Sequence, residues 1–131
     1  MIGAINGYVM TGGLELALSC DLLYASENAV FADTHTKVGV MPTWGMSQRL
    51  PRLIGYGRAK EMSLSGRKID AQTALSWGLV NRIFPPEQLL QEAVKLASEI
   101  AQNNQTIVVG MKSLIDRGAS LPLAEALEYG Q

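Results

Sequence analysis

The stretch NGYVMTGGLELALSCD, residues 6–21, decides the fold of this 131-residue chain. It follows a short apolar run at residues 1–5, which predicts a buried strand, and it begins with the turn dipeptide Asn-Gly. Two further glycines, Gly12 and Gly13, come directly before a segment in which apolar residues repeat at helical spacing. The stretch therefore predicts a strand, a glycine-containing turn and a largely buried helix in succession.

Gly12 and Gly13 place backbone N–H groups at the beginning of this predicted helix, where the helix dipole carries about half a positive charge. Such a turn binds a phosphate, or it stabilises an oxyanion that develops on a carbonyl. The phosphate interpretation is the weaker one, because no Gly-Lys-Ser/Thr follows. Tight packing of the helix on the strand is an alternative explanation of the two glycines.

Glu15 lies near the beginning of the same helix, and its neighbours in sequence are apolar. Burying a carboxylate there costs several kcal/mol unless the group is hydrogen-bonded or neutral. Burial and the helix N-terminus act on the carboxyl group in opposite directions, and this suits a general acid or base. The alternative is a glutamate that caps only its own first turn.

His35 is the only histidine of the chain and lies in the polar segment ADTHTKVG, close to Asp33. Its imidazole can act as acid or base near neutral pH, whereas a solvated loop histidine is the alternative. Trp44 lies between Pro42 and Gly45. We expect its ring either to wall an apolar pocket or to anchor local packing.

The composition excludes several classes of protein. Eleven Lys and Arg against twelve Asp and Glu give a formal net charge of −1, which argues against a nucleic-acid partner. A single cysteine excludes an intramolecular disulfide framework and a metal site of several thiolates, and we predict no metal. No apolar run approaches the roughly 20 residues that span a bilayer, and no secretory signal is visible, so we expect a cytoplasmic protein outside the membrane.

Hydrophobic residues make up 47% of the chain, and the mean hydropathy is +0.10. This is rich for a small monomer and indicates that some apolar surface is covered by something else. The secondary-structure pattern has strands alternating with helices early and helices dominating late, which predicts an α/β fold. The strands are expected at residues 1–5, 22–25, 29–32 and 79–84, a long loop at 33–45, and helices at 14–21, 46–53, 57–64, 71–77, 86–102, 107–117 and 122–129.

Three segments together resemble the enoyl-CoA hydratase/isomerase (crotonase) superfamily. The resemblance implies a partial crotonase-like spiral of ββα turns at residues 1–84 and a helical C-terminal region at residues 85–131, within a single partial domain of residues 1–131. It also implies an acyl-CoA thioester as substrate, no separate cofactor because coenzyme A is part of that substrate, and a homo-oligomer, either a trimer or a hexamer. The segments are INGYVMTGGLELALSCDLLYAS, FADTHTKVGVMPTWGMSQRLPRLIG and SGRKIDAQTALSWGLVNRIF.

The resemblance also implies roles for individual residues. Gly12 matches a backbone donor that stabilises a thioester enolate, and Glu15 matches the first of two acidic residues that handle water and a proton. The second family glutamate falls where His35 stands, so a Glu/His pair replaces two carboxylates. Gly13 and Trp44 complete the substrate-binding residues that we predict.

Two further departures from the family pattern bear on function. Thr43 and Met46 replace family glycines, which together with the bulk of Trp44 predicts a reshaped acyl pocket. The resemblance covers only a middle-to-late part of the family, so we expect a truncated chain that lacks the other oxyanion donor and much of the CoA cradle. The two hypotheses are an enzyme that adds water syn to a 2-enoyl-CoA, or moves another proton beside a thioester, and an inactive crotonase-fold oligomeric or binding module.

Overall fold

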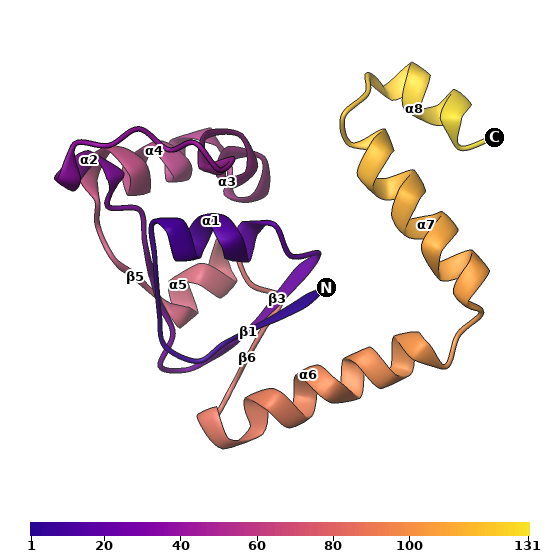
Figure 1. Ribbon diagram of the computed structural model, residues 1–131, viewed down its shortest axis with the longest axis horizontal. Coiled ribbons are helices and arrows are strands. Elements are labelled where there is room, and N and C mark those ends of the chain that lie inside the picture. Colours follow the sequence, from indigo (N-terminus) through magenta and orange to yellow (C-terminus); the bar gives the residue numbers. More distant parts are fainter. The chain divides into compact units, whose positions relative to one another are not determined.

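The computed structural model describes residues 1–131, which form two compact units, Met1–Val94 and Lys95–Gln131 (Figure 1). The strands are β1 Ile2–Ile5, β2 Tyr8–Met10, β3 Leu22–Ser26, β4 Val30–Ala32, β5 Ile69–Asp70 and β6 Arg82–Phe84. The helices are α1 Gly12–Leu18, α2 His35–Val38, α3 Met46–Ile54, α4 Tyr56–Ser65, α5 Ala71–Ser76, α6 Pro86–Ala101, α7 Gln105–Gly118 and α8 Leu123–Tyr129.

The strands of the first unit form two small sheets. One has the order β1-β3-β6 and is parallel throughout, with Ala4 opposite Tyr24 and Ala25 opposite Ile83. The other has the order β2-β4-β5, in which β2 and β4 are parallel and β5 is antiparallel to β4. Parallel pairing with helical crossovers confirms the predicted α/β class.

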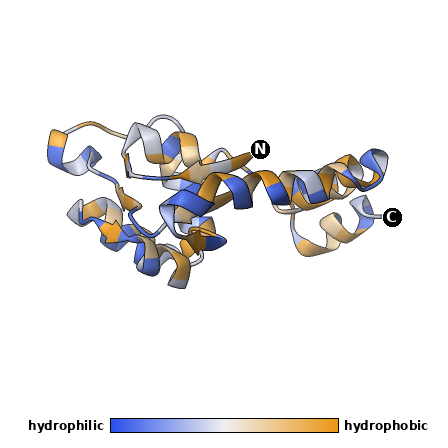
Figure 2. Ribbon diagram, turned by 90° about the horizontal axis from the view of Figure 1, so that it is seen from below, coloured by the Kyte–Doolittle hydropathy of each residue, from blue (hydrophilic) through white to orange (hydrophobic).

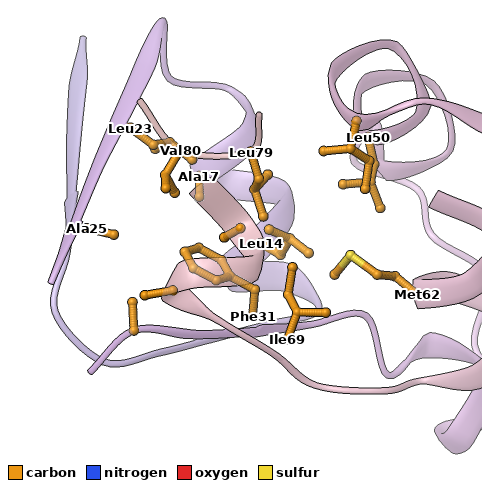
Figure 3. Packing of buried hydrophobic residues seen from close by; sticks show 14 of the residues in the cluster. Leu14, Ala17, Leu23, Ala25, Phe31, Leu50, Met62, Ile69, Leu79 and Val80 are labelled. Atoms are coloured by element: carbon orange, nitrogen blue, oxygen red, sulfur yellow. The ribbon is translucent and has the colours of Figure 1, made fainter. Parts of the chain in front are cut away.

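The core lies between the strands and the helices α1, α3, α4 and α5. Leu14 on α1 and Phe31 on β4 are fully buried and lie close together in Figure 3, with Ile69 beside them. Leu50 and Met62 extend the same cluster toward α3 and α4 (Figure 3). Leu14 packs into this core and thereby fixes the position of α1. Helices α1 and α3 are in contact, so the N-terminal turn of α1 lies next to α3.

The predicted strand at residues 1–5 and the predicted helices are all present, with ends shifted by one or a few residues. A capping hydrogen bond and two left-handed glycines explain where α5 begins and where α4 and α5 end. The Asp70 carboxylate accepts a hydrogen bond from the Thr73 backbone N–H at 2.8 Å and caps α5. Gly78, which follows α5, has φ = 80°, and Gly66, which follows α4, has φ = 70°, so both use the left-handed region.

The observed secondary structure differs from the predicted one at four places. Strands β2 and β5 were not predicted, because three and two residues are too short for a period to show. The predicted loop at residues 33–45 contains α2. The predicted strand at residues 79–84 pairs only from Arg82 onward, because Leu79 and Val80 turn into the core.

The second unit contains the end of α6 together with α7 and α8. Helices α7 and α8 pack on each other, and the Arg117 guanidinium lies 5.0 Å from the centre of the Tyr129 ring. Neither helix has a buried residue, although both carry apolar side chains, and Figure 2 shows hydrophobic and hydrophilic residues mixed along these helices. None of the helices of the chain has the length and apolar character needed to cross a membrane.

Candidate active site

The turn before α1 has an unusual backbone conformation. Thr11 has φ = 50° and ψ = −105°, a combination that residues other than glycine rarely adopt. Its N–H donates to the Ala32 carbonyl at 2.9 Å, and its hydroxyl is hydrogen-bonded to the hydroxyl of Thr34. The Thr34 backbone N–H also donates to the Thr11 hydroxyl at 3.1 Å. The turn is therefore joined to the segment that leads into α2.

Gly12 is the first residue of α1, so its backbone N–H has no acceptor within the helix. A Cβ atom at this position would lie 3.3 Å from the Trp44 ring, which is tighter than ordinary contact. A side chain at position 12 would therefore have to displace the indole by a few tenths of an ångström. At Gly13 the nearest atom, a methyl carbon of Val9, is 4.0 Å away, which is an ordinary packing distance.

Glu15 is buried, with 3% of its surface exposed. Its Oε2 accepts hydrogen bonds from the backbone N–H groups of Trp44, at 2.8 Å, and Met46, at 3.2 Å. The alternative that Glu15 caps its own first turn is wrong, because the carboxylate reaches across to the segment before α3. Two donors on Oε2 leave Oε1 as the oxygen that can exchange a proton.

His35 is the first residue of α2 and is buried, with 8% of its surface exposed. Its Nε2 lies 3.3 Å from Oε1 of Glu15, and its Nδ1 lies 2.6 Å from Oδ1 of Asp33. The alternative of a solvated loop histidine is therefore wrong. Residues 20 positions apart in sequence are brought together as a carboxylate–imidazole pair.

Trp44 is two-thirds exposed, and its ring lies over Gly12. A packing anchor would be buried, so the exposed ring favours the prediction that Trp44 walls a pocket. It lines a hollow of about 580 Å³ beside the N-terminal turn of α1. The other residues of this hollow are Gly12, Gly13, Glu15, Leu16, Ser19 and Arg49.

A second, larger cavity of about 640 Å³ opens beside His35 and Asp33. Val40, Met41 and Leu64 give it an apolar lining. Glu15 lines the first hollow, and His35 lines the second. No group of three His, Cys, Asp or Glu side chains is arranged to hold a metal ion.

The site contains contacts that the sequence did not disclose. In the sequence, Asp33 stands out only as a neighbour of His35, and nothing singles out Ser63, whose hydroxyl donates to Oδ2 of Asp33 at 2.7 Å. An acid two residues before a histidine is a weak signal on its own. Ser63 carries no signal at all, because it lies 30 positions away from Asp33 on α4.

Fold and site together define an α/β protein in which a helix N-terminus lies beside a buried acid–base pair. The family model described as enoyl-CoA hydratase/isomerase matches residues 1–131, and the chain belongs to this family.

Individual relatives agree with this family. A probable peroxisomal enoyl-CoA hydratase of Arabidopsis thaliana is 44% identical over 127 residues, which cover 97% of this chain and 48% of that protein. The crystal structure of an enoyl-CoA hydratase from Mycobacterium avium is 53% identical, with a TM-score of 0.87 over 88% of this chain and 52% of that one. The corresponding structure from Bacillus anthracis is 42% identical, with a TM-score of 0.95 over 97% and 49%.

The similarity to the solved structures confirms the predicted crotonase-like fold, and the chain spans about half the length of the relatives it matches. The expectation of a partial family member is consistent with this coverage.

Proposed function

We propose that this chain carries part of the active site of an enzyme that acts on acyl-CoA thioesters and adds water syn to a 2-enoyl-CoA. The observation that supports this most directly is the 3.3 Å contact between Oε1 of Glu15 and Nε2 of His35. Glu15 lies in the same helix turn as Gly12, whose backbone N–H has no acceptor within α1. Proton transfer and oxyanion stabilisation are the two requirements of addition to an enoyl thioester.

In the proposed reaction, the N–H of Gly12 donates to the thioester oxygen. Glu15 removes a proton from water while the water oxygen forms a bond to Cβ, and the electrons of the Cα=Cβ bond move to the thioester oxygen as an enolate. His35, which reacts as the imidazolium with a proton on each ring nitrogen, donates its Nε2 proton to Cα, and the enolate electrons form the new C–H bond. One water is consumed, and the product is a 3-hydroxyacyl-CoA.

The hydrogen bonds of Glu15 determine which of its two carboxylate oxygens holds the transferred proton. Oε2 is occupied by the N–H groups of Trp44 and Met46, so a proton taken from water is held on Oε1. Nε2 of His35, which has just lost a proton, faces the same oxygen. Direct transfer from Oε1 to Nε2 then restores the starting state of both groups without a further carrier.

Gly13 and Trp44 are proposed as substrate-binding residues, since both line the hollow beside α1. The exposed Trp44 ring limits the room above Gly12 and thereby the shape of the acyl group that is accepted. Coenzyme A enters as part of the substrate, so no separate cofactor is proposed. We also propose a homo-oligomer, a trimer or hexamer as the family resemblance implies, and a cytoplasmic location.

A second candidate function is an inactive crotonase-fold module that binds or oligomerises. The observation that favours it is the coverage of the relatives, of which this chain spans about half. An oxyanion site with one of its two donors missing forfeits about 3–4 kcal/mol of transition-state stabilisation.

Calorimetric titration with a saturated acyl-CoA and a hydration assay with crotonyl-CoA separate the two candidates. Turnover by the 131-residue chain supports the enzyme and eliminates the inactive module. The absence of both turnover and binding at millimolar acyl-CoA counts against the enzyme for this chain. A Glu87→Gln variant, changed at an exposed carboxylate on α6, is the matched control for any variant of Glu15.

A further inference from the structure

Asp33 lies behind His35 and is more deeply buried than either member of the Glu15–His35 pair, with 1% of its surface exposed. Its Oδ1 accepts a hydrogen bond from the backbone N–H of His35 at 3.1 Å and lies 2.6 Å from Nδ1 of the same residue. Its Oδ2 accepts the hydroxyl proton of Ser63 at 2.7 Å. Both carboxylate oxygens are engaged within the protein, which points to a role that is exercised through His35.

The hydrogen bonds of Asp33 fix the state of the imidazole. An ionised carboxylate only accepts hydrogen bonds, so Nδ1 of His35 must carry a proton to donate to Oδ1. The nitrogen that gains and loses a proton is then Nε2, which is the one that faces Oε1 of Glu15 at 3.3 Å. In the Ser-His-Asp triad a buried carboxylate holds the imidazole in the same way.

Ser63 holds this arrangement from α4. Its hydroxyl donates to Asp33, and its backbone carbonyl accepts a hydrogen bond from the hydroxyl of Thr36 on α2 at 2.5 Å. Helices α2 and α4 are in contact, so one residue of α4 ties both the carboxylate and the helix that carries His35.

We propose that Asp33 is a positioning residue for the Glu15–His35 pair, which fixes the Nδ1–H tautomer of His35 and presents Nε2 to Glu15 and to the substrate. Ser63 in turn orients the carboxylate of Asp33. The catalytic consequence of this positioning role rests on the proposed function. The tautomer of the His35 ring can be measured without any substrate.

The test uses the fact that His35 is the only histidine of the chain. Nitrogen NMR of protein labelled with ¹⁵N-histidine therefore reports this ring alone. In the neutral ring we expect the proton on Nδ1, with a proton resonance far downfield as a short hydrogen bond to a carboxylate produces. A proton found on Nε2 instead would overturn the proposal.

Three variants test which side chain sets the tautomer of His35. Asp33→Ala is expected to lose the downfield Nδ1 proton and release the ring into mixed tautomers, whereas Ser63→Ala is expected to retain the Nδ1–H tautomer. Asp33→Asn keeps an oxygen facing Nδ1 but removes the charge, so the proton should resonate less far downfield. If Asp33→Ala does not fold, Asp33→Asn decides the matter, and a spectrum identical to that of the wild type would refute the role of Asp33.

Turnover separates this proposal from the proposed function. We expect Asp33→Ala to lower kcat by about 10²-fold or more and to leave KM within about twofold, since only proton transfer is affected. Equal kcat values for wild type and Asp33→Ala would defeat the positioning role alone. A wild-type chain with the Nδ1–H tautomer and no turnover supports the positioning and counts against the proposed hydration.

Discussion

At the scale of single residues, the site depends on hydrogen bonds and close contacts that link α1 and the turn before it to residues 34–46. The Glu15 carboxylate bridges α1 to the backbone at Trp44 and Met46, and its other oxygen faces His35. Thr11 joins the turn before α1 to Thr34. Each contact can be removed by one substitution, so each role can be tested separately.

The first prediction concerns Glu15→Gln. A glutamine keeps an oxygen for the N–H groups of Trp44 and Met46, and its amide can donate to Nε2 of His35. We therefore expect a fold and stability close to those of the wild type, but a loss of at least about 10²-fold in turnover, a typical contribution of general acid–base catalysis. The crotonyl-CoA assay with Glu87→Gln as control measures this, and an unchanged rate would remove Glu15 from the mechanism.

A second prediction concerns the strained backbone at Thr11, whose φ is 50°. Thr11→Ala removes the hydroxyl and keeps the strain, whereas Thr11→Gly removes both. We expect the glycine variant to be more stable than the alanine variant by about 1 kcal/mol, after allowing for the greater freedom of glycine in the unfolded chain. Urea unfolding of both, with Thr11→Ser as the variant that keeps the hydroxyl, measures this difference, and an alanine variant of equal stability would show that the backbone there carries no strain.

At the scale of elements, the beginnings of helices position the functional residues, and local sequence signals lie beside two of them. Helix α1 begins at Gly12 and α5 begins after Asp70. Both beginnings are signalled locally, by a glycine pair and by a capping carboxylate. By contrast, α2 was missed because four residues of His-Thr-Lys-Val carry no helical period, and it is held by contacts with α4.

The cap of α5 gives a pH-dependent prediction. The hydrogen bond from the Thr73 backbone N–H lowers the pKa of Asp70 below its ordinary value of 3.8. The carboxylate therefore stabilises the fold above pH 3.8, and this contribution is lost as the pH falls through the lowered pKa.

We expect Asp70→Ala to lower the thermal midpoint by a few degrees at neutral pH and to differ less from the wild type in acid. Asp70→Asn should preserve the cap at both pH values, because asparagine caps as well as aspartate. Thermal unfolding of the three proteins at neutral and acid pH checks this. A deficit of Asp70→Ala that is independent of pH would argue against the cap.

At the scale of the whole molecule, apolar surface remains uncovered. Helices α7 and α8 have no buried residue, and the exposed apolar side chains of the second unit include Val109, Ile115 and Leu123. Strand β1 pairs only with β3 and so forms an open edge of its sheet. Exposed edges and contiguous apolar faces favour association between chains.

We therefore expect sedimentation to give a mass above the 14.1 kDa of the single chain. The double variant Val109→Lys/Ile115→Lys is expected to shift the protein toward the monomer, because it places two charges among exposed apolar residues of α7. Gln102→Lys adds a charge at an exposed position outside α7 and serves as control. A wild-type chain that sediments as a monomer would contradict the expected oligomer.

The sequence by itself determined the α/β class, the presence of a helix next to the Gly12-Gly13 pair and the identity of Glu15 and His35 as candidate acid–base residues. These follow from local signals: periodicity, glycine turns, and a carboxylate among apolar neighbours. Only the tertiary structure decided that Glu15 and His35 face each other, that Trp44 covers Gly12, and that Asp33 and Ser63 hold the imidazole. Those contacts join residues that are far apart along the chain, and their distances depend on how α1, α2 and α4 pack around one core.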